Sequence, residues 1–133
     1  MSAPIVDLSY LERLFKGDRS RIDTWVGIYL EEFPAHLDRL EDCLHRNDAS
    51  GLAAVAHDLR PQAHYLGAPR LLDILRSIGE LARTTGPASC ASAVKELRFL
   101  STSIEVELRS RIGQGQWARQ NRYKYEVPDP FTR

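Results

Sequence analysis

The sequence predicts an all-α protein: an antiparallel up-down four-helix bundle with a short additional N-terminal helix. Four long stretches place apolar residues at every third or fourth position, which is the spacing of one buried helix face. No stretch shows sustained alternation of apolar and polar residues, so no β-strand is predicted. The stretches are joined by short connections rich in Gly, Pro, Asn and Asp, and such connections favour antiparallel neighbours.

The first two predicted helices are separated by Gly17. A short helix is predicted to begin at the N-cap residue Asp7 and to end at Gly17. A long helix follows, and its apolar stripe stays in phase on both sides of Pro34, so Pro34 is expected to bend this helix rather than end it. That stripe consists of Ile22, Val26, Tyr29, Phe33, Leu37, Leu40 and Leu44.

Turn residues separate the remaining predicted helices. Residues 47–51 indicate a turn and a cap, residues 67–69 a break with Pro69 in the first turn of a new helix, and residues 84–87 a loop. The first of these helices carries the stripe Leu52, Val55, Ala56, Leu59, Ala63 and Leu66. The next two carry Leu71, Ile74, Leu75, Ile78 and Leu81, and then Ala93, Leu97, Leu100, Ile104, Leu108 and Ile112.

Length and composition predict one domain. The 133 residues suffice for a single core, which we expect over residues 1–112. Residues 113–133 mix aromatic residues with arginines and contain few aliphatic ones, so we expect a loose or surface-wrapped extension, the alternative being a docking segment for a partner. Cys43 and Cys90 lack a C-x-x-C spacing and are expected to be buried or half-buried thiols in a reducing compartment.

Several function classes are disfavoured by the same composition. Lys and Arg number 18, as do Asp and Glu, and this zero net charge argues against binding nucleic acid by neutralising phosphates. No Gly-rich phosphate loop is found, which argues against a nucleotide site. No apolar run is long enough for membrane insertion and no signal peptide is evident, so the cytoplasm is the expected location.

His57 is the candidate reactive residue. At about 100° per residue, Leu59 lies about 200° from His57, so His57 points away from the buried stripe and is expected to be exposed in the middle of a helix. Arg60 lies about 60° around on the same face, His64 follows two turns later, and Gln62 flanks this strip.

An exposed imidazole beside a guanidinium is suited to accept a phosphoryl group. Imidazole is a usable nucleophile near neutral pH because its unperturbed pKa is about 6.5. A phosphoryl group on the ring needs a nearby cation, which Arg60 supplies. On geometry alone, an ordinary surface histidine is the commoner case.

Residues 57–68 read His-Asp-Leu-Arg-Pro-Gln-Ala-His-Tyr-Leu-Gly-Ala. This segment resembles the histidine-containing phosphotransfer (HPt) domain of two-component phosphorelays, whose signature is H-x-L-[KR]-G with a second Gly ten residues after the His. The second Gly, Gly67, has the expected spacing. The upstream residues 31–34 (Glu-Glu-Phe-Pro) and the downstream residues 81–83 (Leu-Ala-Arg) also look like the family, so the resemblance covers about residues 7–110.

The resemblance implies a phosphorelay intermediate rather than an enzyme with its own turnover. A response-regulator receiver domain, fed by a hybrid sensor histidine kinase, would pass its aspartyl phosphate to His57, and a second receiver would take it onwards. Arg60 would neutralise charge on the phosphoryl oxygens. The rim that meets the receiver would consist of Gln62, His64, Gly67 and Arg83. No cofactor or metal is expected on this chain, because Mg²⁺ would come with the receiver, and the chain is expected to be a monomer.

Two departures from the family pattern affect the site. Pro61 stands where Gly is commoner and removes the hydrogen bond to the His57 carbonyl, so a local kink is expected there. Gly79 stands where family members can carry a Gln four residues before an Arg, here Arg83, so that polar support is expected to be missing. These departures keep open an alternative function, an HPt-like helical interaction module without phosphotransfer activity.

Other histidines offer weaker alternatives. His64 is the rival acceptor, although Leu and Arg do not follow it at the right offsets. His36 and His45 are expected to be solvated helix residues. A di-iron bundle needs Glu-x-x-His on inward faces, whereas both of these histidines stand four residues after a glutamate, Glu32 and Glu41.

Overall fold

Helices account for all the regular structure in the computed structural model, which describes residues 4–111. The predicted all-α class is therefore confirmed. In chain order the elements are α1 (Ser9–Leu14), α2 (Arg19–His45), α3 (Ala49–Asp58), α4 (Arg60–Tyr65), α5 (Pro69–Thr84), the 3₁₀ turn η1 (Pro87–Cys90) and α6 (Ala91–Arg111). The predicted extension over 113–133, together with Ile112, lies outside the described residues.

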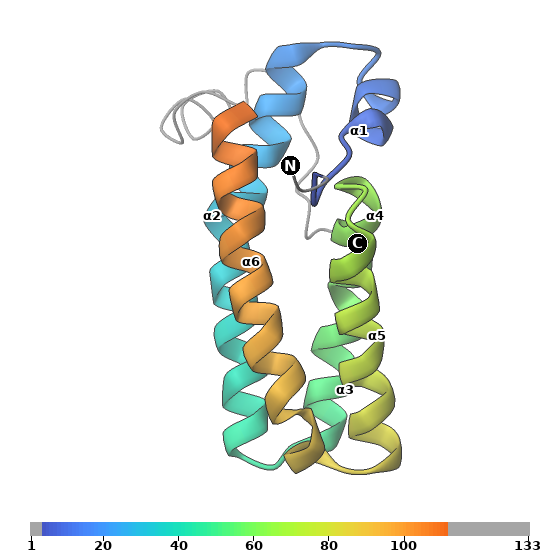
Figure 1. The fold of residues 1–133 in the computed structure, drawn as a ribbon, viewed down its shortest axis with the longest axis vertical. Coiled ribbons are helices and arrows are strands. Elements are labelled where there is room, and N and C mark those ends of the chain that lie inside the picture. Colours follow the sequence, from blue (N-terminus) through green and yellow to red (C-terminus); the bar gives the residue numbers. More distant parts are fainter. Residues whose placement is uncertain (1–3, 112–133) are drawn as a thin grey trace.

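The long helices form an up-down bundle (Figure 1). α2 runs the length of the molecule with α6 beside it, while α3 and α4 follow one another along the second half of the bundle, next to α5. Chain direction reverses between α2 and α3, between α4 and α5 and between α5 and α6, as short loops predict. The predicted four-helix bundle is thus confirmed, with α3 and α4 together forming one of its four members.

The N-terminal segment holds two parts of the bundle together. The backbone N–H groups of Ile5 and Val6 donate to the Glu107 carboxylate on α6 at 3.0 and 2.9 Å, and the Asp7 N–H donates to the Leu66 carbonyl after α4 at 2.9 Å. The predicted N-cap is wrong by one residue, because Leu8 occupies that position at the start of α1 and provides no side-chain cap; Asp7 precedes it, and its Oδ1 accepts the Ser9 N–H at 2.9 Å and the Ser9 hydroxyl at 2.5 Å. These hydrogen bonds lower the pKa of the Asp7 carboxyl, with the hydroxyl contributing most.

α2 continues without a break through Pro34, which lies on an exposed face. The prediction that Pro34 does not end this helix is therefore confirmed. Asp18 caps the start, where its side chain accepts the Arg21 N–H at 3.3 Å. At the other end, Arg98 of α6 forms ion pairs with Asp38 and Glu41, which join α2 to α6.

The chain breaks its helix between α3 and α4, directly after the candidate histidine. Leu59 stays in the right-handed helical region at φ −88° and ψ −10°, but the Gln62 N–H donates to the Leu59 carbonyl at 3.2 Å, a tighter i to i+3 bond. Pro61 lies in the first turn of α4 and has no N–H to donate to the His57 carbonyl. The kink expected from Pro61 is confirmed, and it divides one predicted helix into two.

The predicted apolar stripes fill the core. Their members within the described range are buried, apart from half-buried positions at Leu44, Ile74, Leu81 and Ala93. Aromatic rings extend this core along α2, where the Tyr29 ring centroid lies 6.1 Å from that of Trp25 and 4.8 Å from that of Phe33. Cys43 and Cys90 are free and buried, as expected, and burial raises the pKa of the Cys90 thiol.

Candidate functional site

His57 stands on the last turn of α3 with its side chain exposed. Its neighbours Val55 and Leu59 are only 5% and 1% exposed, so the predicted exposure of this histidine is confirmed, whereas its predicted place in the middle of a helix is wrong because α3 ends at Asp58. An imidazole in this position is accessible to a macromolecular partner, while the helix that carries it is anchored by the core.

Arg60 begins α4, one turn after His57, and is half-buried. Its Nε is buried and has no hydrogen-bond acceptor among the described residues. One terminal nitrogen, Nη2, lies 3.7 Å from the position that a Cβ on Gly79 would occupy. Arg60 therefore extends across to α5 rather than into open solvent.

Arg83 reaches the same place from α5. Its Nη1 lies 3.5 Å from that Cβ position on Gly79, while its Nη2 pairs with the Glu80 carboxylate at 3.5 Å. We call Arg60 and Arg83, whose guanidinium ends both lie near Gly79, the guanidinium pair. Gly79 itself is buried. Gly79 itself supplies no polar side chain, as the sequence predicts, and the guanidinium ends of Arg60 and Arg83 lie near it instead.

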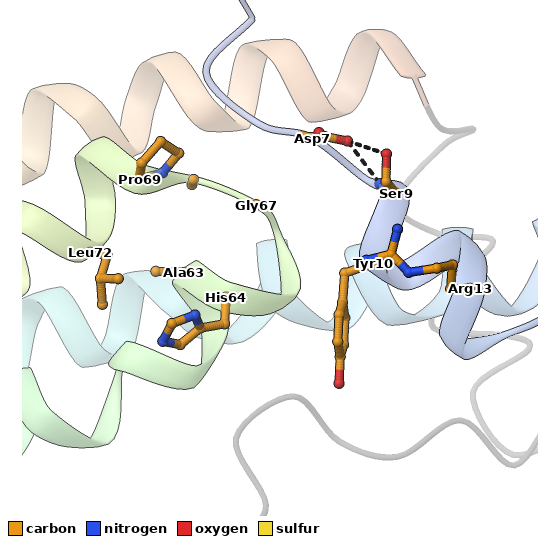
Figure 2. A pocket seen from close by; sticks show the side chains of 10 residues that line it. Asp7, Ser9, Tyr10, Arg13, Ala63, His64, Gly67, Pro69 and Leu72 are labelled. Atoms are coloured by element: carbon orange, nitrogen blue, oxygen red, sulfur yellow. Dashed lines mark hydrogen bonds between the residues drawn. The ribbon is translucent and has the colours of Figure 1, made fainter.

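His64 lies farther along the chain than His57, on the exposed side of α4. It lines a hollow of about 530 Å³ between α1, α4 and the start of α5. Figure 2 shows His64 extending from α4 on one side of this hollow and Tyr10 and Arg13 from α1 on the other. The remaining lining residues are Asp7, Ser9, Ala63, Gly67, Ala68, Pro69 and Leu72.

Gly67 has a structural explanation. Its φ is +55°, and a Cβ there would lie 2.3 Å from the Asp7 carbonyl oxygen. Only glycine adopts this conformation readily and leaves room for the Asp7 backbone. The structure therefore accounts for Gly67 by the attachment of the N-terminal segment, and its predicted place in the receiver-binding rim stays a prediction.

Gln62 does not belong to an exposed strip. Its side chain is only 2% exposed, so the expectation that it flanks His57 on the surface is wrong. Gln62 stands three residues after Leu59 and four before Leu66, which are both buried. That spacing places Gln62 within the core stripe. Spacing alone therefore predicts burial of Gln62, whereas its polar side chain suggests exposure.

The histidines considered for a metal bundle lie elsewhere. His36 is half-buried and its Nδ1 lies 3.4 Å from the Arg39 Nη1, while His45 is exposed. Residues 4–111 contain no group of three or more His, Cys, Asp or Glu side chains arranged to hold a metal ion. Within the same range no helix is long and apolar enough to cross a membrane.

Comparison with models of protein families identifies the family to which this chain belongs. The model of the Hpt domain, the histidine-containing phosphotransfer domain, matches residues 24–112, which is more than half of the chain. The chain belongs to the Hpt domain family. Searches of curated proteins and of solved structures found no match.

Membership in the Hpt family implies a role in a phosphorelay. Members of this family are phosphocarriers rather than enzymes, and receiver domains are their partners. The match begins within α2 and extends past the end of α6, so it includes His57 and both members of the guanidinium pair. α1 and the N-terminal segment precede the matched region.

Proposed function

We propose that this Hpt protein is a phosphorelay intermediate that accepts a phosphoryl group on His57 from a receiver-domain aspartate and passes it to a second receiver domain. The observation that carries the proposal is the exposed imidazole of His57 on a helix anchored by buried neighbours, with the Arg60 guanidinium one turn away. A hybrid sensor histidine kinase is the proposed origin of the phosphoryl group, and the cytoplasm the proposed location of the relay.

The proposed transfer is a substitution at phosphorus. The unprotonated ring nitrogen of His57 attacks the phosphorus of the aspartyl phosphate, and an N–P bond forms as the P–O bond to the aspartate breaks. The electron pair of the broken bond leaves with the aspartate carboxylate. The second transfer reverses these roles, because a carboxylate of another receiver attacks and the imidazole leaves.

The scaffold contributes position and charge. Phosphoryl transfer passes through a loose transition state, so catalysis depends mostly on alignment and on cations near the phosphoryl oxygens. The helix holding His57 is fixed by the core, and Arg60 supplies a permanent positive charge. In this proposal Mg²⁺ is held by the acidic pocket of the receiver.

The test is transfer from a phosphorylated receiver domain to the full chain, followed by measurement of acid-labile phosphate on the chain. We expect labelling of the wild-type protein, loss of labelling in His57→Ala and retention in the matched control His64→Ala. Equal labelling of wild type and His57→Ala would show that another residue accepts the phosphoryl group.

A second function, an interaction module without phosphotransfer, is favoured by one observation. The helix breaks at Leu59, two residues after His57, and Pro61 replaces the commoner Gly two residues later. In that case the receiver would bind the wild-type chain but transfer no label to it. Binding measured by calorimetry in parallel with labelling separates the two functions.

A further inference from the structure

The hollow between α1, α4 and the start of α5 continues to the end of α6. The part that His64 lines has a volume of about 530 Å³, and a second part of about 430 Å³ is lined by Arg111, the last residue of α6. The two parts adjoin, because three residues line both. These are Asp7, Gly67 and Pro69. The chain that follows Arg111 therefore starts beside a path to His64.

The walls of the hollow offer positive charge and an aromatic ring. Arg13 on α1 and His64 on α4 lie on opposite sides, and neither forms an ion pair with a residue of the range 4–111. The carboxylate among the lining residues, Asp7, is already engaged, since hydrogen bonds from Ser9 and, more weakly, the charge of Arg13 lower its pKa. Tyr10 is 44% exposed. These walls suit a ligand that combines carboxylates with apolar groups.

The C-terminal part of the chain contains a segment of this kind. Residues 125–131 read Tyr-Glu-Val-Pro-Asp-Pro-Phe, with two carboxylates, no cation and an aromatic residue at each end. Residues 117–124, in contrast, include three cations. Prolines favour the extended polyproline conformation, which docks against exposed aromatic rings at a low cost in entropy. In charge and composition, residues 125–131 match the hollow better than residues 117–124 do.

The segment is long enough to reach the hollow. Fourteen positions separate Arg111 from Tyr125, and an extended chain of that length spans up to about 46 Å. A helix with its side chains is about 10–12 Å across, and the end of α6 lies at the same end of the bundle as α1 (Figure 1). Both α1 and residues 113–133 lie outside the region that the family model matches, so family membership does not supply this contact.

A groove of about 390 Å³ between α2 and α6 fits the segment less well. It is lined by His45 at the end of α2 and by Arg98 near the start of α6, so it lies at the end of the bundle opposite to Arg111. Arg98 already forms ion pairs with Asp38 and Glu41. This groove therefore serves as the alternative position that an experiment must distinguish.

We propose that residues 125–131 of the same chain occupy the hollow between α1, α4 and the start of α5, with Glu126 and Asp129 facing Arg13 and His64. Because His64 belongs to the predicted receiver-binding rim, the segment competes with a receiver domain for this face, a consequence that rests on the proposed function. A segment on a short linker has an effective concentration on the order of millimolar, so a weak contact is enough to fill the hollow.

The test measures how fast His64 of the full chain reacts with diethyl pyrocarbonate. A ring nitrogen attacks a carbonyl carbon of the reagent, and the ethyl carbonate that leaves takes the ring proton and decomposes to ethanol and carbon dioxide. Mass spectrometry gives the rate at each histidine, and the exposed His45 is the internal control. Combining Tyr125→Ser with Phe131→Ser should speed modification of His64 by about threefold to tenfold and leave His45 unchanged, because only the open hollow admits the reagent.

Matched variants separate this contact from general effects. Trp117→Ser, in the part of the chain before the segment, should leave the rate at His64 unchanged. Arg13→Gln should speed it in the wild-type background but add little to the Tyr125 and Phe131 double variant, because both changes remove one interaction. Arg39→Gln, an exposed cation of α2, is the control for charge, and circular dichroism verifies that each variant is folded.

A synthetic peptide of residues 125–133 tests the competition. Added to the double variant, it should restore the slow modification of His64 and should slow transfer of label from a phosphorylated receiver. A peptide that protects His64 without slowing transfer would overturn the competition. A receiver that transfers no label to any form of the chain would contradict the proposed function but not the occupation of the hollow.

Three results would overturn the occupation itself. One is an unchanged rate at His64 in the double variant. Another is faster modification of His45 in place of His64, which would put the segment in the groove between α2 and α6. The third is a rate at His64 of the wild-type chain that rises on dilution, which would mean that a neighbouring copy supplies the segment.

Discussion

Two glycines of the helical hairpin that α4 and α5 form differ in what surrounds them. Gly67, after α4, has a positive φ of +55° and a backbone oxygen 2.3 Å from where its Cβ would lie. Gly79, inside α5, has helical geometry, and its nearest neighbours are the ends of two arginine side chains at 3.5 and 3.7 Å. Backbone surrounds the first glycine, and charged groups surround the second.

This difference separates a structural requirement from a chemical one. Gly67 allows the N-terminal segment to pack against the end of α4, and a substitution there disturbs the fold. Gly79 could accept a methyl group without disturbing the fold, so packing does not require a glycine there. Substitutions at the two glycines should therefore change stability in opposite directions.

The largest effect on stability is expected at Leu59, whose burial holds together the hairpin that carries both glycines. Leu59→Ala should lower the free energy of unfolding by about 2–5 kcal/mol through lost burial and a cavity. His57→Ala, two residues earlier and exposed, should leave stability nearly unchanged. Urea unfolding of both variants measures this contrast, and the reverse pattern would mean that the face assigned to the core is the exposed one.

The next largest effect on stability is expected from Gly67→Ala. This substitution should lower the free energy of unfolding by about 3 kcal/mol, because alanine is strained in the left-handed conformation and its Cβ clashes with the Asp7 backbone. Urea unfolding measures the loss, and amide hydrogen exchange should show reduced protection of the Asp7 N–H, which donates to the Leu66 carbonyl. A loss below about 1 kcal/mol would contradict the structural role of this glycine.

Gly79→Ala should stabilise the protein by about 0.5–1 kcal/mol, because alanine favours the helix and reduces the freedom of the unfolded chain. The expected sign is therefore opposite to that at Gly67. Thermal unfolding is the measurement, and a clear drop in Tm would show that a Cβ does not fit beside Arg60 and Arg83.

The smallest effect is expected at Asp7, next to Gly67. Hydrogen bonds from Ser9 lower the pKa of Asp7, so its carboxylate stabilises the fold above the carboxyl's unfolded pKa, and this contribution is lost as the pH falls through the lowered folded value. Asp7→Asn keeps an oxygen acceptor but removes the charge. The loss in free energy of unfolding caused by Asp7→Asn should be small at neutral pH and should vanish in acid, which urea unfolding at both pH values measures. A loss that does not depend on pH would contradict the assignment of this stabilisation to the ionised Asp7 carboxylate.

Much of the fold could be predicted from local pattern. The stripes on α2 to α6 follow helical periodicity, and Pro61 predicts the break at Leu59 because proline lacks the N–H that its helix needs. Gln62 is buried although its polarity suggests exposure, because its spacing from Leu59 and Leu66 puts it on the core face. The 3₁₀ turn η1, only four residues long, carries no periodic signal of its own.

The site could be predicted only in part. Exposure of His57 follows from the phase of one helix, which the sequence contains. The guanidinium pair depends on how α4 packs against α5 and on which rotamers Arg60 and Arg83 adopt there. Neither property is local, so Gly79 could be identified as a departure from the family pattern but not as the place where two cations meet.

The central claim is that His57 carries the phosphoryl group. The most direct measurement incubates the full chain with a phosphorylated receiver domain and maps the modified residue by tandem mass spectrometry under non-acidic conditions. The account predicts a phosphate on His57 and none on His36, His45 or His64. Phosphate found on one of those three histidines, with His57 unmodified, would contradict it.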